Sequence, residues 1–88
     1  MTSTKLIEQF LDAVWVEQGL SENTLSAYSS DLRIFAKWLK DKSLLDVDTG
    51  DLSGFLASRY KEGIGNRSSA RILSSLRRFY GYFIEKIK

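Results

Sequence analysis

The fold is decided by the stretch NRSSARILSSLRRFYGYFIEKIK, residues Asn66–Lys88. A helix turns by about 100° per residue, and a helix over this stretch has one apolar side and one polar side. The apolar side is formed by Ile72, Leu73, Leu76, Phe79, Tyr80, Phe83, Ile84 and Ile87. The polar side carries Arg67, Ser68, Arg71, Ser74, Ser75 and Arg78. The pattern predicts a long helix that packs on a core along one side and presents arginines and small hydroxyls along the other. The polar side is either plain solvated surface or a surface for phosphate groups.

Positive charge is concentrated on this predicted helix. Residues 1–65 hold seven Lys/Arg against ten Asp/Glu, whereas residues 66–88 hold six Lys/Arg and one Glu. The net charge of +2 hides this difference between the two parts of the chain. A charge asymmetry of this kind points to an anionic partner.

The remaining sequence predicts three further helices. They are expected over about Thr4–Gln18, Ser21–Lys42 and Thr49–Glu62, with Gly19 ending the first and Asn66 capping the fourth. No stretch alternates with period two for long enough to predict a strand. The expected architecture is an all-α, compact orthogonal four-helix bundle, and the whole 88-residue chain is expected to be one domain.

The apolar spacing also predicts which side chains of the second half are buried. The third helix is expected to bury Leu52, Phe55, Leu56 and Tyr60. The connector before it is expected to tuck Leu44, Leu45 and Val47 under the core.

The composition excludes several kinds of site. The chain contains no Cys and no His, so it has no thiolate ligand, no disulfide and no Ser-His-Asp or Cys-His arrangement. The acidic run Asp46, Asp48 and Asp51 lacks the Gly and the distal Glu of a calcium loop, and helix capping explains it better. The four tyrosines lack the Arg and His cluster that activates a nucleophile. We therefore expect no metal, no cofactor and no catalytic residue in these 88 residues. No apolar run approaches a membrane span and no signal-peptide pattern is present, which favours a cytoplasmic protein.

Polar residues also mark the second helix as a possible contact surface. Asn23 and Thr24 lie in its first turn, and Arg33 adds charge further along. Short polar groups suit phosphate oxygens or base edges, and a major groove of about 12 Å accepts a helix. If the polar sides of both long helices face the same way, the domain presents paired helices to DNA.

Three segments resemble one family in order and spacing. LIEQFLDAVWVEQGLSENT (Leu6–Thr24), LSENTLSAYSSDLRIFAKWL (Leu20–Leu39) and SSARILSSLRRFYGYF (Ser68–Phe83) are similar to the N-terminal core-binding domain of Xer-type tyrosine recombinases, the XerD-like branch in particular. That domain is the SAM-like domain of the phage-integrase family. The resemblance covers nearly the whole chain.

The resemblance implies a clamp around double-stranded DNA. In this family the N-terminal domain covers one face of a recombination half-site, and its second and fourth helices lie across the major groove. Carried onto this sequence, the expected DNA contacts are Asn23, Thr24, Arg33, Arg67, Ser68, Ser69, Arg71, Ser75 and Arg78.

The resemblance also implies that the catalytic residues lie in a C-terminal domain that is absent from this chain. The fragment is then no enzyme, although the parent would cut and rejoin DNA in site-specific recombination or integration. Its other expected partners are the parent's catalytic domain and further recombinase subunits on the DNA. The alternative function is a helical protein–protein interaction module whose basic face meets an acidic partner.

Overall fold

The chain folds into four α-helices and one short 3-10 helix. The structure is a computed structural model that describes the backbone of residues 3–87 and the side chains of residues 3–84. The elements are α1 (Ser3–Gln18), α2 (Glu22–Leu39), η1 (Leu44–Asp46), α3 (Thr49–Lys61) and α4 (Asn66–Ile87). Residues 3–87 form no strand. The predicted all-α fold is confirmed.

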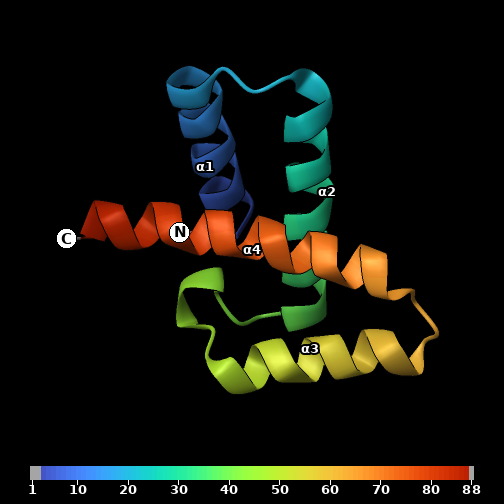
Figure 1. Cartoon of the computed structure of the whole chain (residues 1–88). Helices are drawn as coiled ribbons and strands as arrows, with labels where there is room; N and C mark the ends of the chain where they lie inside the picture. The colour runs from blue at the N-terminus through green and yellow to red at the C-terminus, as the bar shows by residue number, and fades with distance from the viewer. Residues whose placement is uncertain (1–2, 88) are drawn as a thin grey trace.

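The helices form two pairs that cross each other. In Figure 1, α1 and α2 stand side by side and are joined by a short loop at one end. The α3–α4 pair runs across the first pair, and α4 passes over both α1 and α2. The amphipathic helix α4 therefore contacts every other helix of the bundle.

Local signals in the sequence set most of the helix ends. The Ser21 side chain accepts a hydrogen bond from the Thr24 backbone N–H at 3.2 Å. Asp48 and Asp51 form a capping box at the start of α3, as the acidic run predicted. Gly19 ends α1 with φ +58°, a left-handed conformation that favours glycine.

Two predicted ends are wrong. α2 ends at Leu39, three residues before the predicted Lys42, because Lys40 turns the backbone with φ +60°. At α4, the Ser69 N–H bonds to the Gly65 carbonyl, so Gly65 holds the cap position and Asn66 lies inside the first turn. The sequence favoured Asn66 as the cap because Asn is a better capping residue than its neighbour Gly65.

The core is built around four fully buried phenylalanines. Phe10 and Phe79 have ring centres 5.5 Å apart, and Phe35 and Phe55 have ring centres 4.9 Å apart. Both pairs meet edge to face, which is a favourable aromatic geometry. The remaining buried apolar side chains are Leu6, Ile7, Val14, Leu32, Leu39, Leu44, Ile72, Leu76 and Phe83. The predicted burial of Leu44 and of the apolar side of α4 is thus largely confirmed.

Three side chains that were expected in the core are exposed. Tyr60 is 79% exposed, Ile84 is 56% exposed and Leu45 is 48% exposed. In α3 the buried position one turn after Phe55 is taken by Arg59, which turns the neighbouring Tyr60 to solvent. The side chain of Ile87 lies outside the described residues.

Truncation of Leu76 to alanine should cost about 2–5 kcal/mol of unfolding free energy, because it leaves a cavity beneath α4. Leu76 is only 2% exposed. The matched control is Val16→Ala, since Val16 is 80% exposed on α1 and its loss should change stability by less than about 0.5 kcal/mol. Urea unfolding of both variants measures the difference. Equal losses in the two variants would show that α4 does not hold the core through Leu76.

Candidate nucleic-acid interface

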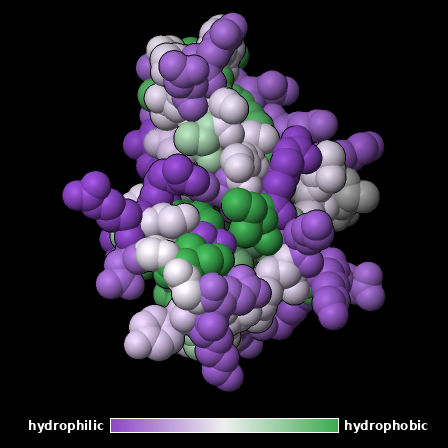
Figure 2. Space-filling view, turned by 90° about the vertical axis from the view of Figure 1, so that its right-hand side faces the viewer, coloured by the Kyte–Doolittle hydropathy of each residue, from purple (hydrophilic) through white to green (hydrophobic). Residues whose placement is uncertain are grey.

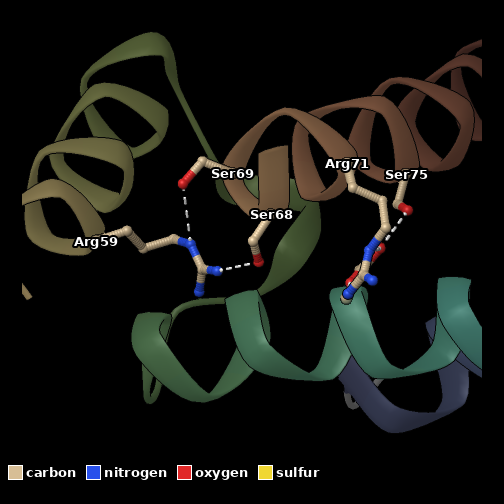
Figure 3. A network of polar contacts seen from close by, with 6 residues as sticks. Arg59, Ser68, Ser69, Arg71 and Ser75 are labelled. Atoms are coloured by element: carbon tan, nitrogen blue, oxygen red, sulfur yellow. Dashed lines mark hydrogen bonds and ion pairs between the residues drawn. The ribbon is translucent and has the colours of Figure 1, made fainter. Parts of the chain in front are cut away.

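The two longest helices are joined at their crossing by a buried carboxylate. Asp31 of α2 is fully buried. Arg71 of α4 donates to it from Nε at 3.2 Å and from Nη2 at 2.8 Å, and Ser75 donates from its hydroxyl at 2.8 Å. Figure 3 shows Arg71 and Ser75 reaching from the same side of α4 toward one point on α2.

These three hydrogen bonds make the burial of Asp31 possible. A buried carboxylate without partners is strongly unfavourable, whereas a bidentate arginine neutralises it and satisfies both of its oxygens. In turn, hydrogen bonding to Asp31 and its negative charge raise the pKa of the Arg71 guanidinium. The network therefore fixes the position of α4 on α2 as well as the orientation of Arg71.

The network corrects two expectations for the polar side of α4. Ser75 was placed on the exposed side, but it is 2% exposed and faces α2. Arg71 was expected among the DNA contacts, and the structure shows that two of its nitrogens are already bound to Asp31. The helical wheel assigned both residues to the solvent side because they are polar. In the structure they face α2 because Asp31, their hydrogen-bond partner, lies there. The sequence did contain one signal, because Asp31 lies inside the apolar stripe of α2.

A second network engages Ser68 and Ser69. Arg59 of α3 donates from Nη2 to the Ser68 hydroxyl at 2.9 Å and from Nε to the Ser69 hydroxyl at 3.4 Å. Its guanidinium lies 5.5 Å from the centre of the Phe55 ring, and the residue is only 7% exposed. Figure 3 shows this group between the end of α3 and the start of α4. The two serines therefore tie α4 to α3, and sequence reasoning missed Arg59.

The remaining predicted residues of α4 are accessible. Arg67 and Arg78 are both exposed, and Arg78 donates a hydrogen bond to the side-chain oxygen of Gln18 on α1. Gln18 is neutral, so Arg78 keeps its net charge. The exposed residues Arg67, Arg71, Ser74 and Arg78 recur every three or four positions and form one line along α4. We call these four residues the α4 basic stripe.

Two further features lie beside the α4 basic stripe. Arg77 is exposed next to it and was not among the predicted contacts. A hollow of about 260 Å³ lies between α1 and α4 and is lined by Glu17, Gln18 and Arg78 among others. On the side of the molecule where α4 begins, Figure 2 shows hydrophilic side chains surrounding a small apolar area.

The predicted residues of α2 do not all face α4. Asp31 marks the side of α2 that meets α4. Thr24 lies two turns before Asp31, on about the same side, and its hydroxyl is 3.0 Å from that of Ser21. Arg33 lies about 200° around the helix from Asp31 and donates to the Ser29 hydroxyl at 3.0 Å. Asn23 is exposed in the first turn. The structure thus brings Thr24 to the side of the α4 basic stripe and turns Arg33 away from it.

The described residues contain no group of three or more Asp, Glu, His or Cys that could hold a metal ion. None of the helices they form is both long enough and apolar enough to cross a membrane.

Comparison with known proteins identifies the class of this fold. Residues 7–86 match the family described as "Phage integrase, N-terminal SAM-like domain". Because the match covers almost the whole chain, the chain belongs to this family as its N-terminal SAM-like domain. No solved structure matches the chain at a significant level.

The relatives specify the branch of the family that the chain is similar to. The chain is 54% identical over 86 residues to a Proteus mirabilis protein named Tyrosine recombinase XerD, a match that covers 94% of the chain. It is 49% identical over 82 residues to the protein of that name from Shewanella oneidensis, covering 91% of the chain, and 43% identical over 84 residues to that from Haemophilus influenzae, covering 93%. The matched region spans only 28%, 27% and 28% of these three relatives, respectively.

Replacement of Ser75 by alanine should lower the unfolding free energy by about 1–3 kcal/mol, because it removes a hydrogen bond to a buried carboxylate. Ser74→Ala is the matched control, since Ser74 is its exposed neighbour and its loss should cost less than about 0.5 kcal/mol. Thermal and urea unfolding would measure both variants. If the two variants proved equally stable, Ser75 would not support Asp31.

Proposed function

We propose that residues 1–88 bind double-stranded DNA in a sequence-directed way, as the N-terminal clamp domain of a site-specific tyrosine recombinase. The observation that carries this proposal is the α4 basic stripe, which runs along the exposed side of the longest helix. Arginines and hydroxyls in one line suit the phosphates of a duplex. Membership of the phage-integrase family and relatives named tyrosine recombinase support the same function.

The proposed role of each side chain follows from its exposure, its charge and the hydrogen bonds that it already makes. Arg67 and Arg78 contact phosphates, because each is exposed and carries a charge that no carboxylate neutralises among the described side chains. Asn23 and Thr24 contact the DNA from the start of α2. Ser68, Ser69 and Ser75 support the surface from beneath through their hydrogen bonds to Arg59 and Asp31. Arg33 faces another side and is not part of this surface.

The wider setting of the domain belongs to the same proposal. The catalytic residues lie in a C-terminal domain outside residues 1–88, and this stretch contributes DNA binding without chemistry. The parent protein acts in the cytoplasm with other recombinase subunits in DNA recombination or integration, which includes chromosome dimer resolution. The relatives' name, tyrosine recombinase, supports the role in DNA recombination.

The dependence of duplex binding on salt tests the proposal. Because Arg67 and Arg78 are the two proposed phosphate contacts, the logarithm of affinity should fall with the logarithm of salt concentration at a slope of about −1.8. Arg67→Ala should reduce the magnitude of this slope by about 0.9. Lys61→Ala is the control, because it removes the same charge from an exposed position on α3 and should leave the slope unchanged.

The competing function makes a different prediction for the same protein. An interaction module with a basic face would bind an acidic protein tightly and would show no duplex binding even at low salt. That result would refute the DNA-binding proposal.

A further inference from the structure

Asp31 occupies one edge of the Arg71 guanidinium and leaves another edge free. An arginine has five N–H donors, of which the Nε–H and one N–H of Nη2 point to the carboxylate. The outer edge, formed by Nη1 and the second N–H of Nη2, has no hydrogen-bond partner among the described residues. The Arg71 side chain is 58% exposed, so this edge is open to a ligand.

We infer that Arg71 reads a guanine base in the major groove through this outer edge, and that Asp31 and Ser75 act as its positioning residues. The inference rests on the proposed function and specifies which arginine selects sequence. Two parallel N–H groups of an arginine match the O6 and N7 acceptors of guanine, and this pairing is the commonest specific contact in protein–DNA complexes.

Charge distinguishes Arg71 from the other arginines of the α4 basic stripe. Asp31 neutralises Arg71 within the protein, and the pair therefore releases few counterions from a phosphate backbone. Arg67 and Arg78 keep their net charge and suit phosphates better. A fixed orientation matters little for gripping a phosphate, but it is required for distinguishing one base from another. The bidentate contact with Asp31 supplies that orientation.

The position of Arg71 in the fold agrees with a base contact. It lies where α2 and α4 cross, between the two long helices. In a duplex the phosphates line the rims of the groove and the base edges form its floor. A residue at the centre of a two-helix surface therefore faces the floor, whereas residues further along each helix face the rims.

Selection of bound duplexes from a randomised pool tests this inference. The wild-type chain should prefer guanine over other bases at one position of its site by roughly 5- to 150-fold. Arg71→Lys should lose this preference, because lysine keeps the positive charge near Asp31 but offers no planar pair of donors. Arg67→Lys is the matched control on the same helix and should leave the base preference unchanged.

A chemical change in the DNA gives a second, independent readout. Replacing the selected guanine by 7-deazaguanine removes the N7 acceptor and should weaken wild-type binding, with no further effect on Arg71→Lys. The variant Asp31→Asn should reduce the guanine preference, because Arg71 loses the carboxylate that orients it. Its affinity for random duplex should not fall, because Arg71 then carries a net charge. Circular dichroism checks that this variant is folded. A purely structural role of Asp31 would lower binding to all sequences alike.

The outcomes separate the inference from the proposed function. If Arg71→Lys keeps the wild-type base preference, or if it weakens all sequences equally as Arg67→Lys does, Arg71 is not the base-reading residue and the inference is wrong while DNA binding stands. Failure of the wild-type chain to bind any duplex at low salt would overturn both.

Discussion

The structure depends on the burial of one carboxylate at the crossing of α2 and α4. Asp31 has no exposed surface, and Arg71 and Ser75 of α4 supply its hydrogen bonds. A different crossing of the two packed helices would leave the Asp31 carboxylate buried without its partners, which is far less favourable than the loss of an apolar contact. The packing of Phe10, Phe35 and Phe79 allows the helices to associate, and the Asp31 network selects one way of crossing.

The same helix builds both the core and the candidate interface. One side of α4 buries Ile72, Leu76 and Phe79, and the opposite side carries the α4 basic stripe. At its start, Arg59 of α3 holds the first turn through Ser68 and Ser69. The first turn of α4 is hydrogen-bonded to α3, and Arg71 and Ser75 further along are hydrogen-bonded to α2. The arginines of α4 are therefore presented on a rigid scaffold, which favours specific binding over non-specific electrostatic attraction.

Periodicity and capping residues predicted the four helices, and the order of residues along the chain predicted the family, because both are local properties of the sequence. The pair of Asp31 and Arg71 spans 40 positions and depends on how two helices cross, which no helical wheel contains. For the same reason Ser75 was assigned to the solvent side and Arg59 was overlooked, while Tyr60 was assigned to the core. Arg71 and Ser75, which hold α4 to α2 through Asp31, were assigned to the surface because they are polar.

A double-mutant cycle on Asp31 and Arg71 tests the central claim most directly. Unfolding free energies would be measured for Asp31→Ala, Arg71→Ala, the double variant and Arg67→Ala as a control from the same stripe. If Asp31 and Arg71 stabilise the crossing as a pair, Arg71→Ala destabilises the fold more than Arg67→Ala, because it leaves the Asp31 carboxylate buried without its partner. The double variant is then more stable than Arg71→Ala and about as stable as Asp31→Ala, because the unpaired carboxylate is gone. Strictly additive losses, or an Arg71→Ala variant as stable as Arg67→Ala, would contradict the account.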